Sequence, residues 1–170
     1  MTDDLLWQFD LAWVLADLHL SALVDDDFLW QPAPLCWTVR PDTDGVWRPD
    51  WADYEPDPLP VPTIGWLTWH IDWWWSVTVD HLRSASPRDR TDVTWPGGGG
   101  AAVTRLRELA AQWRELLVHM DSDELARPSA FPWGTDAGRT VAHTVLWVNV
   151  ELTKNISEIG QLRLLRAAQA

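Results

Sequence analysis

Apolar residues recur at three- and four-residue steps in four stretches of the chain, which is the spacing of an amphipathic helix. The four stretches are residues 4–24, 63–83, 101–120 and 140–168. In the first, Leu6, Phe9 and Trp13 fall on one stripe. Thr63 precedes the second stretch and is a residue type that caps helix N-termini. The pattern therefore predicts four helices.

The first two predicted helices are separated by residues 25–62, which are rich in both proline and tryptophan. Proline lacks an amide hydrogen and has a fixed φ, so this stretch cannot form a continuous helix or a central strand. Residues such as Trp30, Trp37 and Trp51 give it much apolar surface to bury, unlike a disordered linker. We expect a long irregular connection that packs across one end of the helices.

Four amphipathic helices without a convincing alternating strand pattern predict an all-α fold, a four-helix bundle. The chain has the length of one domain, so we expect residues 1–170 to form a single unit. An up-down-up-down order of the helices is expected but is not forced, because the first connection is long. The run PGGGG at residues 96–100 indicates a flexible turn before the third helix.

The charge of the chain limits its partners. Lys and Arg number 13 against 25 Asp and Glu, a formal net charge of −12, which repels a phosphate backbone and argues against nucleic acid. No apolar run approaches 18 residues and the first residues lack a signal peptide pattern, so no membrane partner is expected. With Cys36 as the one cysteine, we expect a cytoplasmic protein, a monomer or a homodimer.

Tryptophan is the strongest compositional signal, with 15 in the chain and five of them in the stretch GWLTWHIDWWWS, residues 65–76. Tryptophan suits flat, partly wet walls where the indole N–H finds a partner, which favours a ligand pocket. His70 stands within this stretch, and its neighbours at helical spacing are apolar, so its ring is predicted to point inward. Such a histidine is either a satisfied core residue or part of a functional site.

The fourth predicted helix offers polar residues to face His70. Glu151 and Asn155 lie four residues apart on the same predicted face as the apolar stripe. A carboxylate facing an apolar interior is costly unless it is paired, hydrogen-bonded or bound to a cation, and helical bundles build metal sites in this way. The alternative is a surface pair, with Lys154 and Glu158 flanking a solvated seam.

The chain resembles the DinB-like superfamily of four-helix proteins, which includes mycothiol- and bacillithiol-dependent thiol transferases and mycothiol-dependent maleylpyruvate isomerases. The resemblance covers nearly the whole chain. It is carried by residues 28–71, similar to the Trp- and Pro-rich segment of the actinobacterial branch, and by NVELTKNISEIGQLR, residues 149–163. It implies an enzyme that acts on a small electrophilic or unsaturated molecule in a pocket between the second and fourth helices.

In that family a divalent metal is held by a histidine on the second helix and by two residues four apart on the fourth. The resemblance assigns His70 and Glu151 to the first two positions, whereas Asn155 stands at the third in place of histidine. An asparagine oxygen is a weak ligand beside imidazole, so the implied zinc or nickel is bound weakly or not at all. The metal would stabilise a low-molecular-weight thiol as its thiolate. Lys154, turned inward, would instead pair with Glu151 and replace the cation.

The implied substrate site contains Asn155 and five tryptophans, namely Trp66, Trp69, Trp73, Trp74 and Trp147. Three functions remain open. The first is a thiol-dependent transferase or isomerase with an altered metal site. The second is a metal-free isomerase or cyclase in which His70 and Glu151 act as acid and base. The third is a small-molecule binding protein without catalysis.

Overall fold

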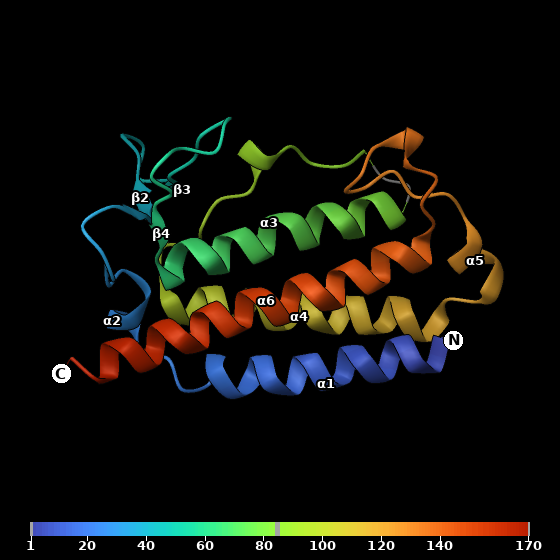
Figure 1. Cartoon of the computed structure of the whole chain (residues 1–170), viewed down its shortest axis with the longest axis horizontal. Coiled ribbons are helices and arrows are strands. Elements are labelled where there is room, and N and C mark those ends of the chain that lie inside the picture. Colours follow the sequence, from blue (N-terminus) through green and yellow to red (C-terminus); the bar gives the residue numbers. More distant parts are fainter. Residues whose placement is uncertain (1, 84–85, 170) are drawn as a thin grey trace.

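The computed structural model describes residues 2–83 and 86–169, and most of them are helical (Figure 1). The long helices are α1 (Thr2–Leu20), α3 (Ile64–Leu82), α4 (Gly99–His119) and α6 (Val141–Ala167). The short ones are α2 (Asp25–Phe28), α5 (Ser122–Ala126) and the 3₁₀ turns η1 (Arg90–Asp92) and η2 (Thr135–Ala137). The prediction of a mainly α-helical chain is confirmed.

The helix ends follow the local signals closely. The Thr63 hydroxyl accepts a hydrogen bond from the Trp66 amide at 3.3 Å, so it caps α3 as the sequence predicts. Helix α1 ends at Leu20, before the predicted residue 24, because Val24 already caps α2 and its amide donates to the Asp27 carboxylate at 2.8 Å. In α6 every residue of the predicted inward stripe is buried: Val141, Val145, Val148, Leu152, Ile159 and Leu162.

Helix α1 packs between α4 and α6, and contacts across these interfaces give their directions. Arg107 and Arg114 of α4 donate to Asp17 and Asp10 of α1, both at 2.9 Å, so these two helices run antiparallel. A residue near the start of α6 contacts the first half of α1, and a residue in the second half of α6 contacts the end of α1, so α6 and α1 run parallel. The contacts are Asn149 with Gln8 and Gly160 with His19.

Helices α3 and α4 pack against each other and run in the same direction. Their first turns meet the same residue, because a Cβ placed on Gly65 would lie 3.0 Å from the Phe28 carbonyl oxygen and one placed on Gly99 would lie 2.3 Å from the Phe28 ring. Further along, the guanidinium of Arg105 on α4 donates to the buried Asp72 carboxylate of α3 at 3.1 Å.

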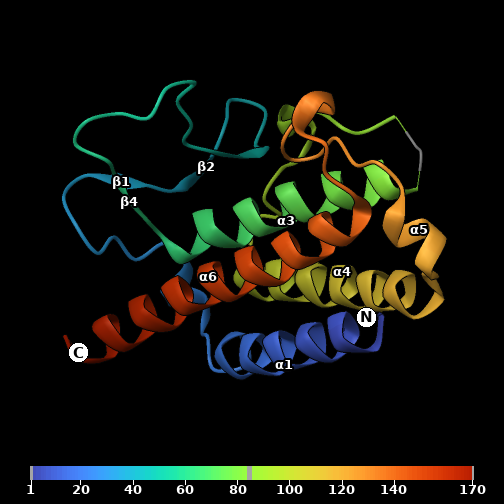
Figure 2. The ribbon, with the colours of Figure 1, turned by 45° about the vertical axis from the view of Figure 1, so that its right-hand side comes forward.

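The predicted up-down-up-down order is therefore wrong, since α3 and α4 are parallel and so are α1 and α6 (Figure 2). The physical reason is the length of the connection between α3 and α4. An extended chain advances about 3.3 Å per residue and a helix rises about 1.5 Å, so residues 83–98 can recross the whole of α3. The chain uses this length to return α4 to the end where α3 begins.

The connection of residues 25–62 lies over the end where α3 begins and contains two small sheets that the sequence did not predict (Figure 1). β1 (Cys36–Trp37) pairs in parallel with β4 (Val61–Pro62), and β2 (Val39–Pro41) pairs antiparallel with β3 (Trp47–Pro49). Each strand has two or three residues, too short to alternate visibly, because prolines interrupt the ladders. The Trp95 amide donates to the Trp47 carbonyl at 3.0 Å, which ties this connection to the next one.

The core runs between the four long helices and is aromatic at its centre. Trp75 and Trp113 are fully buried, and Phe9 meets Trp75 edge to face at a centroid distance of 6.0 Å. Within residues 2–83 and 86–169, no helix combines the length and the apolar character needed to cross a membrane.

Candidate functional site

His70 lies on α3 inside a group of tryptophans. Its imidazole stacks on Trp66, with ring centroids 4.8 Å apart and planes 13° apart, and meets Trp73 edge to face at 5.5 Å. Its Nδ1 is buried and has no hydrogen-bond partner among the described residues. Burial and, to a smaller extent, the positive charge of Lys154 together lower the pKa of His70 from 6.5 to about 4. The imidazole is therefore neutral near pH 7.

Asn155 is buried on α6 and both ends of its amide are engaged. Its Oδ1 accepts a hydrogen bond from the indole N–H of Trp74 at 3.1 Å. Its Nδ2 donates to the Glu158 carboxylate at 3.0 Å. These two partners fix which atom is oxygen and which is nitrogen. Asn155 therefore joins α6 to α3 through Trp74.

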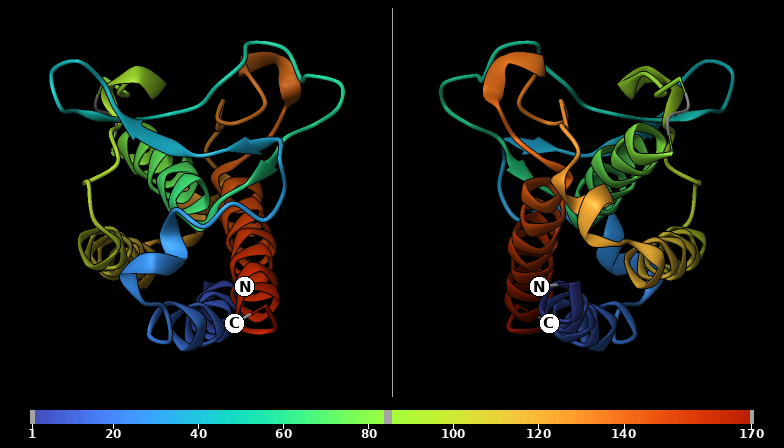
Figure 3. Two further views of the ribbon diagram at one scale, coloured as in Figure 1. Left: turned by 90° about the vertical axis from the view of Figure 1, so that its left-hand side faces the viewer. Right: turned by 90° about the vertical axis from the view of Figure 1, so that its right-hand side faces the viewer.

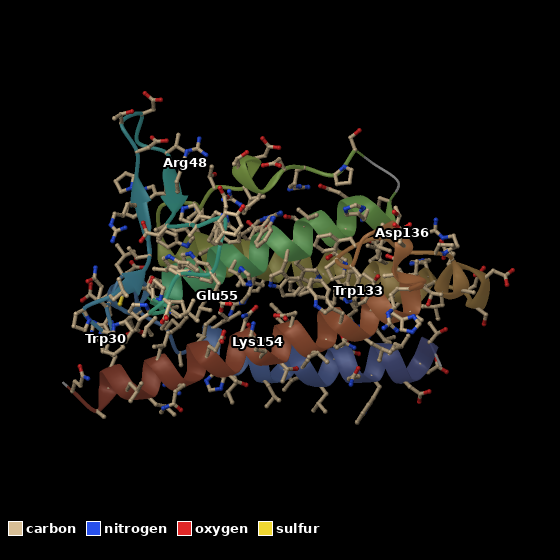
Figure 4. The ribbon with its side chains drawn as sticks, turned by 45° about the horizontal axis from the view of Figure 1, so that its top comes forward. Trp30, Arg48, Glu55, Trp133, Asp136 and Lys154 are labelled. Atoms are coloured by element: carbon tan, nitrogen blue, oxygen red, sulfur yellow. The ribbon has the colours of Figure 1, made fainter. Side chains whose placement is uncertain are left out.

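Glu151 and Lys154 form an ion pair on α6, one helical turn apart. The ammonium nitrogen lies 3.2 Å from the Glu151 carboxylate oxygen, and Lys154 stands on the edge of α6 that faces α3 (Figure 4). The Glu151 side chain is only 22% exposed, so it has little water to replace a lost partner. Because the same ammonium acts on the pKa of His70, the three side chains form one electrostatic group.

These contacts test whether the residues fit the divalent metal that the resemblance implies. The Asn155 oxygen already accepts from Trp74, and the Glu151 carboxylate is paired with Lys154. In the described part of the chain, no three His, Cys, Asp or Glu side chains converge as a metal-binding group. The donor set does not fit a three-ligand divalent site, and a lysine carries positive charge beside the Glu151 carboxylate.

Three of the predicted pocket tryptophans are buried and bonded within the protein. The indole N–H of Trp66 donates to the Asp50 carbonyl at 2.8 Å, and that of Trp69 donates to the Val93 carbonyl at 2.8 Å. Trp74 is bonded to Asn155 as described above. Trp66 and Trp69 therefore anchor the two long connections to α3, and Trp74 joins α3 to α6.

Trp73 and Trp147, in contrast, keep part of their surface exposed, so a bound molecule would meet these two indoles first. Trp51 joins them from the 25–62 connection and was absent from the predicted site. The ring of Trp51 meets Trp73 edge to face, with ring centroids 5.2 Å apart. The guanidinium of Arg90, from the connection between α3 and α4, lies 4.3 Å from the centroid of the Trp51 ring. The high tryptophan content of the 25–62 connection could have indicated that Trp51 lies beside the predicted site residues.

Two hollows flank this group of side chains along α6. One, of about 270 Å³, lies beside Trp147 and is also lined by Trp133 and Arg139. The other, of about 440 Å³, lies beside Glu158 and is also lined by Val61. His70 lines neither of them, and Glu151 and Lys154 lie on α6 between the residues that line the two hollows.

Comparison with known protein families gives a match that spans most of the chain. The sequence model of the DinB superfamily matches residues 8–159, which include every predicted site residue. The comparison with curated proteins finds no match. The chain therefore belongs to the DinB superfamily.

Proposed function

We propose that this protein acts on a small, largely apolar, unsaturated molecule by acid–base chemistry, without a divalent metal. The reacting group consists of His70, Glu151 and Lys154, with Trp73 and Trp147 as the aromatic walls. The observation that carries the proposal is the Lys154–Glu151 pair at 3.2 Å beside the fully bonded Asn155. The chain itself supplies a positive charge beside the Glu151 carboxylate.

His70 acts in this proposal as a neutral hydrogen-bond donor. An orphaned buried N–H is rarer than an unmet acceptor, so we assign the bare nitrogen to the buried Nδ1 and the proton to Nε2. A neutral imidazole donor of this kind can polarise a substrate carbonyl without giving up its proton. Trp66 and Trp73 cover part of the ring, and the lower polarity on that side strengthens the hydrogen bond.

Glu151 serves as the base. Its carboxylate takes a proton from the carbon next to the polarised carbonyl and returns it to another carbon of the same conjugated system, so the reaction is an isomerisation. Lys154, paired with this carboxylate, stabilises the negative charge that develops on the substrate after the transfer. The exposed ammonium would also stabilise the thiolate of a low-molecular-weight thiol if one takes part. The proposal places the protein in a reducing cytoplasm.

Metal content and turnover test the proposal together. We would purify the protein from cells supplied with zinc and nickel, measure bound metal, and screen small α,β-unsaturated carbonyl compounds for isomerisation. We expect far less than one metal per chain and no effect of a chelator on turnover. Glu151→Gln and His70→Gln should each lower kcat by about 100-fold, within the usual range for a lost acid or base.

Glu108→Gln, an exposed carboxylate on α4, is the matched control and should leave kcat unchanged. Stoichiometric metal whose removal abolishes turnover would contradict the proposal. A ligand that binds but is never converted, with unchanged affinity in Glu151→Gln, would instead indicate a binding protein.

A further inference from the structure

Helix α1 is apolar on two opposite faces. The buried face consists of Leu5, Phe9, Ala12, Ala16 and Leu20. The opposite face, here named the outer stripe, consists of Trp7, Leu11, Val14, Leu15 and Leu18, which are 47–67% exposed. At about 100° per residue, these five positions fall within an arc of about 100°. A surface helix normally has one apolar face, so the outer stripe needs a partner.

Three polar residues on the flanks of α1 are bonded to the neighbouring helices. Asp10 pairs with Arg114 and Asp17 with Arg107, while Gln8 accepts from Asn149 at 2.9 Å. The carboxylates of Asp10 and Asp17 are thus neutralised within the chain, whereas the exposed Asp4 lies at the N-terminal end of the stripe and lines the hollow shared with α6. An apolar surface can cover the stripe without leaving the charges of Asp10 and Asp17 unpaired.

The outer stripe continues onto α6. Leu146 and Val150 are 45% and 62% exposed, and a hollow of about 390 Å³ between the two helices is lined by Trp7 and Leu146. Together these side chains expose on the order of 700 Å², close to the roughly 800 Å² that each partner buries in a standard interface. Monomeric proteins rarely expose a continuous apolar patch larger than a few hundred Å².

We propose that the outer stripe binds a second copy of this chain and forms a two-fold symmetric dimer. Positions 7, 11, 14 and 18 follow the four-three-four spacing of a coiled-coil seam, which packs best against a helix with the same spacing. Two-fold symmetry makes the same patch serve both copies, with α1 antiparallel to α1. A membrane surface fits poorly, because the flanks of α1 carry aspartates and the chain has a net charge of −12.

The dimer does not rest on the proposed function, because the outer stripe contains none of His70, Glu151 and Lys154, although Leu146 and Val150 of α6 also line the hollow beside Trp147. Figure 3 shows α1 on the side of the molecule opposite the connections that lie over α3. Failure of the dimer and failure of the catalytic proposal can therefore be told apart.

Sedimentation equilibrium of the full chain, between about 1 and 100 µM, tests the proposal. We expect a dimer in the unmodified protein and a monomer in the double variant Leu11→Lys with Leu18→Lys, whose dissociation constant should rise at least about 100-fold. The matched control, Leu35→Lys with Leu59→Lys, changes two leucines of similar exposure on the 25–62 connection and should remain dimeric. Circular dichroism checks that each variant is folded.

If the lysine variant does not fold, the milder pair Leu11→Ser with Leu18→Ser provides the same comparison. An unmodified protein that is monomeric at 100 µM would overturn the proposal, as would a dimer unaffected by either stripe variant. Binding of a monomer to anionic lipid vesicles, lost in the stripe variant, would show that the stripe meets a membrane instead.

Discussion

At the residue scale, Asn155 determines how α3 and α6 meet. The resemblance treats this position as a weakened metal ligand, whereas the structure uses it to satisfy the buried indole N–H of Trp74 and to hold Glu158. The Asn155 amide thus links α6 to α3 at a position where the resemblance implies a metal ligand. Lys154 makes the complementary change, because it pairs with Glu151 on the same turn.

Replacing Asn155 by alanine should lower the free energy of unfolding by about 2 kcal/mol, because it leaves the Trp74 N–H buried without an acceptor. Urea denaturation followed by tryptophan fluorescence measures the change. Ser157→Ala, two residues further along at an exposed position of α6, should change stability by less than about 0.5 kcal/mol. Equal effects in the two variants would mean that the Trp74–Asn155 bond contributes nothing.

The lowered pKa of His70 predicts how the free energy of unfolding depends on pH. The unfolded chain binds a proton at the ordinary histidine pKa of 6.5, whereas the folded chain binds it only near pH 4. The stability that neutral His70 contributes is complete above pH 6.5 and is lost as pH falls toward 4. Between pH 7 and 5 we expect a loss of about 2 kcal/mol that His70→Gln does not show. Denaturant titrations of both proteins at the two pH values test this, and parallel losses would contradict it.

At the element scale, the glycines of PGGGG have different roles: one is required by the turn and another by packing between helices. Gly97 has a φ of +83°, as a turn glycine can adopt, but Gly99 and Gly100 belong to the first turn of α4. A Cβ on Gly99 would lie 2.3 Å from the ring of the buried Phe28, while a Cβ on Gly100 meets nothing within 4 Å. Gly99 therefore allows α2 and α4 to approach, which a flexible turn does not require.

Gly99→Ala should destabilise the protein by about 2 kcal/mol, because the Phe28 ring is buried and must move. Gly100→Ala is the matched control and should be neutral or stabilise by up to about 0.5 kcal/mol, since alanine favours helix over coil. Thermal unfolding of the two variants gives the comparison. A Gly99→Ala protein as stable as the parent would mean that Phe28 repacks freely.

At the scale of the whole molecule, the acidic surface opposes compaction. The net charge of −12 places like charges close together, whereas the exposed ion pairs such as Arg114–Asp10 are each worth less than about 1 kcal/mol. We expect self-repulsion to outweigh the surface pairs, and the same repulsion acts between two copies in the proposed dimer. Salt should favour both folding and association.

Raising NaCl from about 0.02 to 0.3 M should increase Tm by a few degrees, because screening weakens the repulsion between carboxylates. Differential scanning calorimetry at constant protein concentration measures the shift. A variant with two exposed carboxylates neutralised, Asp53→Asn with Glu55→Gln, should show a smaller increase. A fall in Tm with salt would mean that the ion pairs dominate.

The sequence by itself determined the features that depend on neighbours along the chain. Helical spacing located the four long helices, Thr63 marked the start of α3, and the apolar stripe of α6 is buried as predicted. The placing of His70 and Glu151 on neighbouring helices also followed from these patterns and from the resemblance to the DinB superfamily, which the family match supports.

Only the tertiary structure decided what depends on contacts between distant segments. α3 and α4 run parallel because the long connection between them returns along α3. The periodicity within a helix does not indicate whether that helix runs parallel or antiparallel to its neighbour. The bond between Trp74 and Asn155 joins residues 81 positions apart, and Trp51 reaches Trp73 from an irregular segment. A side chain's chemistry follows from its partners, and these residues acquire their partners only when the helices pack.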